Sequence, residues 1–144
     1  MMFDFTDRTL VLTGANGGIG RAVAELFAAA GANLVLADLD GAALAEFTAT
    51  LNGPEKRGRG KIETLAMDAA NPADADRVIA AAADLGGVDF LVPSAGIYLA
   101  EPFAQMSDEQ WRRTLSINLD GVFYITRRAT DHLTEGSSIV NLSS

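Results

Sequence analysis

The chain has 144 residues, 49% hydrophobic and 7% aromatic, which is enough for about one domain with a packed core. Its formal net charge of −8 argues against nucleic-acid binding. The absence of cysteine and the single histidine exclude disulfides, thiolate sites and multi-histidine metal sites, so no metal is expected. No apolar run is long enough to span a membrane and no signal peptide is visible, so the default expectation is a cytoplasmic protein without a membrane partner.

Strand and helix patterns alternate along the chain. Short apolar runs predict strands at 9–13, 33–37, 62–67, 89–92 and 138–142. Helical periodicity and breakers predict helices at 18–30, 42–51, 72–85 and 107–132, the last with a bend near 118–121. The order predicts an α/β fold, a Rossmann-type doubly wound parallel sheet with strand order 3-2-1-4-5. Residues 1–144 then form one dinucleotide-binding domain, or part of one.

The predicted helices also carry apolar residues at helical spacing. In the first helix, four of them predict one apolar face: Ile19, Val23, Leu26 and Phe27. In the long helix, Trp111 and Leu115 lie four residues apart and are expected in the core. Ser107 and Gln110 have the spacing of a capping box, which predicts the helix start.

A glycine-rich turn joins the first strand to the first helix. Gly14 permits a tight turn, Gly18 lets a pyrophosphate approach the backbone, and Gly20 lets the helix pack close to the sheet. The helix that begins there directs free N–H groups at an anion. The alternative is a hairpin turn at Asn16 and Gly17, but helical periodicity follows instead of a second strand. The turn therefore predicts a dinucleotide phosphate site.

Two aspartates follow the next strands. Asp38 lies eighteen residues after Gly20, where a carboxylate can accept hydrogen bonds from both ribose hydroxyls and repel a 2′-phosphate. Because Gly17 and Leu39 offer no positive charge, NAD is favoured over NADP. Asp68 either meets the adenine edge together with Ala69 or only starts a turn, and both interpretations stay open.

These residues resemble the classical short-chain dehydrogenase/reductase family from Thr13 to Ser144. The stretch from Thr13 to Gly20, including Asn16, Gly17 and Ile19, is similar to the family's Thr-Gly-x-x-x-Gly-x-Gly cofactor motif. The resemblance implies that Asp68 contacts adenine, that Asn118 is the asparagine of the catalytic tetrad and that Ser144 is the catalytic serine. It also implies a homodimer or homotetramer.

The chain departs from the family pattern at two places. The family's Asn-Asn-Ala-Gly motif is replaced by Pro93-Ser94-Ala95-Gly96, in which Ala95 and Gly96 still offer a close approach to a nucleotide. The Tyr-x-x-x-Lys pair expected after the serine is not in this sequence, and neither are the family's C-terminal strands.

Two functions from different classes remain. The first is an NAD(H)-dependent oxidoreductase that transfers a hydride between nicotinamide and an alcohol or carbonyl, provided that the missing tyrosine and lysine exist. This chain alone is then expected to be inactive. The second is a non-catalytic dinucleotide-binding module. The sequence leaves the substrate open among sugar alcohols, hydroxysteroids and acyl-thioester ketones.

Overall fold

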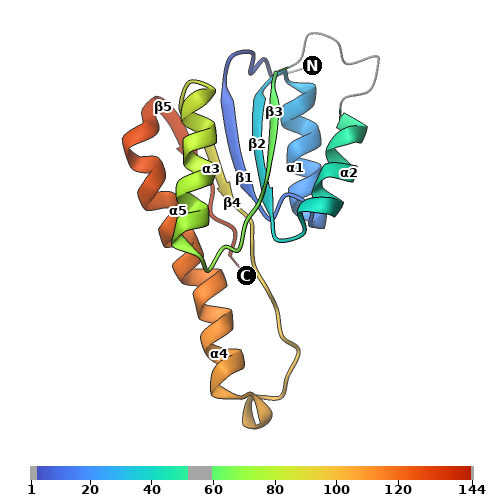
Figure 1. Ribbon diagram of the computed structural model, residues 1–144, viewed down its shortest axis with the longest axis vertical. Coiled ribbons are helices and arrows are strands. Elements are labelled where there is room, and N and C mark those ends of the chain that lie inside the picture. Colours follow the sequence, from blue (N-terminus) through green and yellow to red (C-terminus); the bar gives the residue numbers. More distant parts are fainter. Residues whose placement is uncertain (1–2, 52–59, 144) are drawn as a thin grey trace.

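The computed structural model describes residues 3–51 and 60–143 and confirms the predicted sheet (Figure 1). Five parallel strands pair in the order β3-β2-β1-β4-β5. In chain order they are β1 (Thr9–Thr13), β2 (Asn33–Asp38), β3 (Ile62–Ala66), β4 (Val88–Pro93) and β5 (Leu133–Ile139). The central strand β1 has β2 on one side and β4 on the other. The strands β2 and β3 therefore extend the sheet on one side of β1, and β4 and β5 extend it on the other side.

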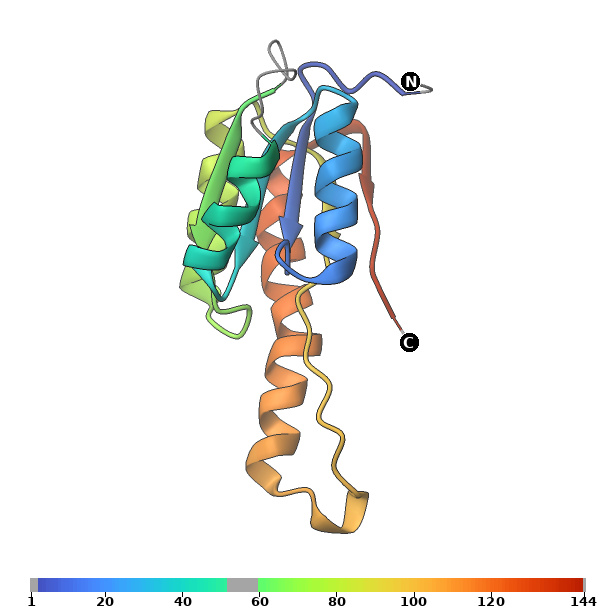
Figure 2. The ribbon, with the colours of Figure 1, turned by 90° about the vertical axis from the view of Figure 1, so that its right-hand side faces the viewer.

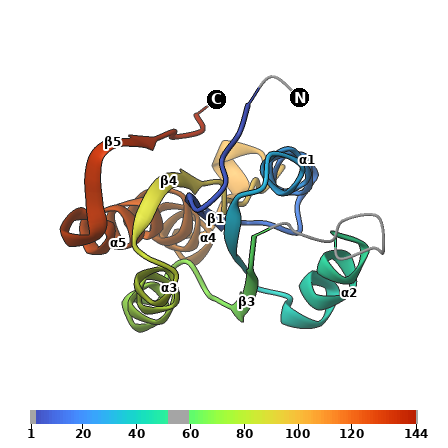
Figure 3. The same cartoon turned by 90° about the horizontal axis from the view of Figure 1, so that it is seen from above.

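Helices cover both faces of the sheet (Figure 3). The helices are α1 (Gly18–Ala29), α2 (Gly41–Leu51), α3 (Pro72–Asp84), α4 (Asp108–Leu115) and α5 (Gly121–Ala129). Alternation along the strands divides the core, because successive side chains point to opposite faces. Leu10 and Leu34 pack toward α1 and α2, whereas Val11 and Val35 pack toward α3 and α5. Both faces are buried, which explains the nearly continuous apolar runs in β1 and β2.

The predicted apolar face of α1 is correct in part: Val23 and Phe27 pack against the core, whereas Ile19 and Leu26 do not. Ile19 is 61% and Leu26 is 70% exposed, whereas the buried residues of this helix are Gly20, Ala24 and Ala28. The small side chains at these three positions let the helix lie close to the sheet. Figure 2 shows α1 lying along β1.

A long helical arm follows β4 and extends beyond the sheet (Figures 1 and 2). It consists of the short 3₁₀ helix η2 (Phe103–Gln105), α4, the π-helical segment η3 (Ser116–Asp120), α5 and the 3₁₀ helix η4 (Thr130–His132). The capping box of Ser107 and Gln110 starts α4 as predicted. The expected core position of Trp111 is wrong: this side chain is 51% exposed and α4 buries no residue, because the helix lies past the end of the sheet.

The last strand begins earlier than the predicted range 138–142. It spans Leu133–Ile139, because pairing with β4 starts as soon as the helix ends, with Leu133 opposite Val88. The Ser137 hydroxyl donates to the Val88 carbonyl (2.8 Å) across the irregularity that follows. The Val140 N–H still donates to the Leu91 carbonyl (2.9 Å). Because alternate residues of a strand direct their backbone groups to the same neighbouring strand, Pro93 is the next residue of β4 after Leu91 whose N–H would face β5. Proline has no backbone N–H to donate. This explains why the β4–β5 pairing ends here.

Among the described residues, none of the helices has both the length and the apolar character that crossing a bilayer requires.

Candidate cofactor site

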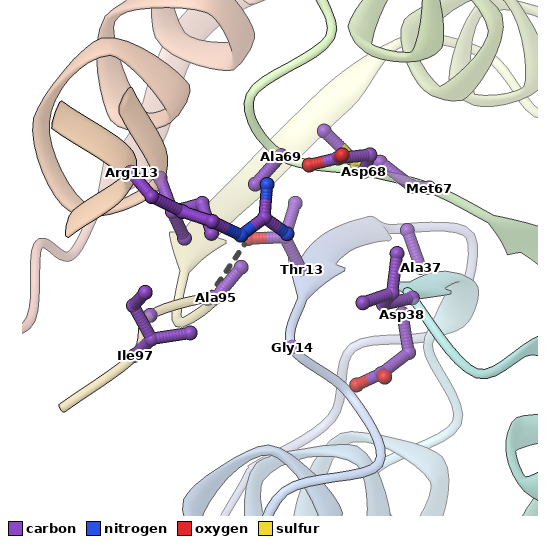
Figure 4. A pocket seen from close by; sticks show the side chains of 13 residues that line it. Thr13, Gly14, Ala37, Asp38, Met67, Asp68, Ala69, Ala95, Ile97 and Arg113 are labelled. Atoms are coloured by element: carbon purple, nitrogen blue, oxygen red, sulfur yellow. Dashed lines mark hydrogen bonds between the residues drawn. The ribbon is translucent and has the colours of Figure 1, made fainter. Parts of the chain in front are cut away.

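A pocket opens at the carboxyl ends of the strands, where the connections from β1 and β4 leave in opposite directions (Figure 4). This is the place where doubly wound sheets bind their ligands. Residues after four strands and from the arm line it: Thr13, Gly14, Ala37, Asp38, Leu39, Met67, Asp68, Ala69, Ala95, Gly96, Ile97, Arg113 and Ile117. Six residues that the sequence analysis assigned to the cofactor are thus brought together: Gly14, Asp38, Asp68, Ala69, Ala95 and Gly96.

The glycine-rich turn is sterically closed at two of its glycines. Gly14 has φ +65°, and a Cβ there would lie 2.7 Å from the backbone nitrogen of Ala95. A Cβ on Gly20 would overlap the carbonyl oxygen of Gly14. Contacts this close leave no room for a methyl group, so both positions require glycine. The turn, the α1 start and the loop after β4 are therefore held against one another.

Gly18 is different, because its missing side chain faces open space. No atom lies within 4 Å of a Cβ built there. The cap residue Gly17 offers no side-chain hydrogen bond, and the first turn of α1 contains no acidic residue. Backbone N–H groups in the first turn of a helix have no partner within the helix. This uncapped helix start is accessible to an anion, and a pyrophosphate fits it.

Asp38 is oriented by the same turn. Its Oδ2 accepts a hydrogen bond from the Asn16 N–H (2.9 Å), and Oδ1 accepts a longer one from the Asp40 N–H (3.3 Å). The Arg21 guanidinium donates to the Asn16 carbonyl (3.0 Å) and lies over the Phe47 ring, 4.8 Å from its centroid. The turn thus fixes a carboxylate in the lining of the pocket, and this carboxylate retains acceptor capacity for a diol.

Asp68 belongs to a small network at the end of β3. Its Oδ1 accepts from the Ala70 N–H (3.0 Å), which confirms the turn interpretation, and the residue also lines the pocket. Its own N–H donates to Asp74 (2.8 Å), and Asp74 is bound by Arg77 (2.8 Å). The Arg77 guanidinium, followed by the Asp68 N–H, lowers the pKa of the Asp74 carboxyl below its ordinary value of 3.8.

This lowered pKa predicts an acid-sensitive support for Asp68. A carboxyl whose pKa is lower in the folded than in the unfolded state stabilises the fold at pH values above its unfolded-state pKa. This stabilisation is lost as the pH falls through the folded-state pKa. We expect Asp74→Asn to lower the thermal midpoint at pH 7 and to weaken its dependence on pH below about 4. Asp84→Asn removes an exposed carboxylate from the same helix and is the control. Parallel pH profiles for wild type and Asp74→Asn would contradict the prediction.

A second hollow lies beside the loop after β4. Its lining joins the start of α1, this loop, the π segment and the end of the described chain: Ile19, Pro93, Ser94, Ala95, Gly96, Asn118, Val122, Leu142 and Ser143. Ala95 and Gly96 are shared with the first pocket, so the two hollows meet across the loop. Ile19 and Asn118, both predicted site residues, face this second hollow. Ser144, the predicted catalytic serine, lies outside the described residues, although its neighbour Ser143 lines the hollow.

The Asn118 side chain is a clamp on the loop after β4. Its Oδ1 accepts from the Ile97 N–H (2.8 Å) and its Nδ2 donates to the Ile97 carbonyl (2.8 Å). Oδ1 would also lie 3.3 Å from a Cβ on Gly96. The residue sits in the π-helical segment, at the place where the sequence predicted a bend. Asn118 therefore positions the loop that borders both hollows.

We expect Asn118→Leu to release this loop. The substitution removes two hydrogen bonds and should cost about 1–2 kcal/mol of stability, while weakening dinucleotide binding roughly fivefold or more. Thermal unfolding and cofactor titration check both effects. Ser116→Ala is the control in the same segment, because its hydroxyl bonds only the carbonyl of Arg113. Equal binding by wild type and Asn118→Leu would show that the clamp is unnecessary.

Several lining residues are not marked by any motif in the sequence. Arg113 and Ile117 come from the arm and reach the pocket only through the fold. Among the residues described, no group of three or more histidine, cysteine, aspartate or glutamate side chains is arranged to hold a metal ion.

Comparison with known proteins agrees with this geometry. A family model described as short chain dehydrogenase matches residues 8–144. The chain belongs to this family. It is 36% identical to D-threitol dehydrogenase of Mycolicibacterium smegmatis over 146 residues, which cover 99% of this chain and 55% of that protein. It is 36% identical to 3beta-hydroxysteroid dehydrogenase 1 of Eggerthella lenta over 151 residues, which cover 100% of this chain and 56% of that protein.

Solved structures give the same result. A Brucella melitensis crystal structure described as short-chain dehydrogenase/reductase SDR:Glucose/ribitol dehydrogenase is 60% identical, with a TM-score of 0.92. The match covers 99% of this chain and 59% of that one. The chain thus spans little more than half the length of these relatives. Members of the short-chain dehydrogenase family are oxidoreductases that bind nicotinamide dinucleotides, and the pocket and the glycine-rich turn fit such a cofactor.

Proposed function

We propose that this chain binds NAD(H) for the transfer of a hydride between nicotinamide and an alcohol or carbonyl substrate. The observation that carries the proposal is the placement of Asp38 in the lining of the pocket, oriented by the Asn16 N–H. A carboxylate there accepts bonds from ribose hydroxyls and repels a 2′-phosphate. Gly17 and Leu39 place no cation beside it, so NAD is proposed over NADP.

In this proposal the residues act as a positioning frame. The start of α1 binds the pyrophosphate, Asp38 the ribose, and Asp68 with Ala69 the adenine edge. Asn118 holds the loop that carries Ala95 and Gly96. When bound, the cofactor exchanges a hydride at nicotinamide C4 with the carbinol carbon, while the hydroxyl proton passes to a base.

The acid–base and substrate-binding parts of the reaction require further groups. We propose that the family's tyrosine and lysine, which are not in this sequence, supply the base, and that Ser144 hydrogen-bonds the substrate oxygen. This 144-residue chain alone is then inactive. The names of the polyol-related relatives make sugar alcohols the first substrate class to assay, with hydroxysteroids second.

A binding titration with NADH and NADPH tests the cofactor proposal on the chain itself. Binding of neither cofactor would overturn it. Assay of the protein as its cell makes it then separates the two functions: turnover of an alcohol with NAD supports the dehydrogenase. If that protein instead lacks Tyr-x-x-x-Lys and binds NADH without turnover, the second candidate, a non-catalytic dinucleotide-binding module, replaces it.

We also propose a homodimer or homotetramer formed through the arm. Large apolar side chains remain exposed on it: Trp111 is 51%, Leu119 62% and Phe123 57% exposed. Single exposed apolar residues are common, but three along one helical stretch favour a helix-on-helix interface. We further propose that the protein is located in the cytoplasm. The mass in solution and the localisation of a tagged chain test these two points.

A further inference from the structure

Arg113 lines the cofactor pocket from outside the sheet. It lies in the last turn of α4, and the pocket also contains Asp38 and Asp68. Figure 4 shows its side chain extending from the arm toward the interior of the pocket, on the side of Asp68. Of the lining residues that the structure describes, Arg113 is the only basic one. In a chain with a net charge of −8, a single arginine in the lining of this pocket requires a physical reason.

Packing and pairing within the fold do not supply that reason. Across residues 3–51 and 60–143, the Arg113 side chain forms no ion pair or hydrogen bond. Its neighbour Arg112 approaches Asp108 at 3.9 Å on the exposed side of the helix. A helix-dipole role is also excluded, because α4 continues through η3 into α5 and its last carbonyls are not at a helix end.

We propose that Arg113 is a cofactor-positioning residue that closes the adenine end of the pocket. Its guanidinium lies against the adenine ring, on the side of the pocket where Asp68 stands. This inference rests on the proposed binding of NAD(H).

The chemistry of the side chain fits this role. A guanidinium is planar and weakly hydrated, so it stacks on an aromatic ring more readily than an ammonium group does. Adenine is the flat aromatic part of the dinucleotide, and stacking of a cation on a ring favours binding. Apolar side chains also line the pocket near Arg113, with Ile117 on the same arm one turn further along the chain and Ile97 on the loop after β4. The planar cation and these apolar side chains together form a slot for a base.

The test measures which part of the dinucleotide loses affinity. NADH, ADP-ribose and reduced nicotinamide mononucleotide are titrated into wild type, Arg113→Ala, Arg113→Lys and the control Arg112→Ala. We expect Arg113→Ala to weaken the binding of NADH and of ADP-ribose about 3- to 30-fold. Arg113→Lys, which keeps the charge and loses the plane, should fall between Arg113→Ala and wild type. The mononucleotide, which lacks adenine, should bind all four proteins equally.

Other patterns overturn the inference. Unchanged NADH affinity in Arg113→Ala, an equal loss in Arg112→Ala, or a parallel loss for the mononucleotide would each remove the adenine role. If wild type binds neither NADH nor ADP-ribose, the proposed function fails and the inference fails with it. Wild-type binding combined with an unaffected Arg113→Ala overturns the inference alone.

Discussion

Replacing Gly20 with alanine is expected to destabilise the fold and to abolish dinucleotide binding. The added methyl group would overlap the carbonyl oxygen of Gly14, inside the turn that joins β1 to α1. The overlap involves backbone on both sides and no flexible side chain can move away, so α1 must shift from the sheet. We expect a loss of about 3 kcal/mol or more, read as a fall of roughly 10 °C in the thermal midpoint.

Gly18→Ala is the matched substitution, and it separates stability from binding. No atom lies within 4 Å of the added methyl group, so the fold has room for it. Alanine is favoured over glycine in a helix by roughly 0.5–1 kcal/mol, so the thermal midpoint should stay level or rise. The methyl group would stand where the pyrophosphate approaches the backbone, and NADH affinity should fall about tenfold or more. Full NADH binding by a stable Gly18→Ala protein would place the phosphates elsewhere.

Removing the charge of Asp38 is expected to erase the preference for NADH. Asp38→Asn keeps an oxygen that can accept from the Asn16 N–H, so the turn should survive. Charge-assisted hydrogen bonds to the ribose contribute about 1.5–3 kcal/mol, and their loss should weaken NADH binding roughly 10- to 100-fold. NADPH should bind better than it does to wild type, because the repulsion of its 2′-phosphate is gone.

Asp40→Asn controls for net charge. Asp40 lies two residues away and its Oδ1 accepts from the Ala43 N–H (3.0 Å) at the start of α2, a bond that an asparagine can keep. It does not line the pocket. We expect the ratio of NADH to NADPH affinity to remain at the wild-type value in Asp40→Asn. A collapse of that ratio in both variants would assign the preference to general charge and not to Asp38.

The topology was predictable from the sequence because its signals are local. Alternating apolar runs and helical periodicity led to the order 3-2-1-4-5, since each connection in a parallel sheet has one preferred hand. The glycine-rich turn and Asp38 lie close together in the sequence and follow adjacent strands, so their proximity could also be expected. An irregularity was expected near Asn118 as well, and the π segment η3 lies at this place.

The errors arose where long-range contacts decide the outcome. Ile19 and Leu26 follow the helical period but are exposed, because Ala24 and Ala28 form the close contact with the sheet. Trp111 is exposed because α4 lies beyond the sheet, and periodicity carries no information about where a helix is placed. Arg113 reaches the pocket only through the fold of the arm, so no spacing in the sequence could identify it.

The most direct test of the account is the pair of equilibrium dissociation constants of NADH and NADPH for the unmodified chain, measured in one buffer at one salt concentration. We expect NADH to bind at least tenfold more tightly than NADPH, because the Asp38 carboxylate accepts hydrogen bonds from the ribose hydroxyls and repels a 2′-phosphate. Equal or tighter binding of NADPH would contradict the role of Asp38, and binding of neither would contradict the cofactor site itself.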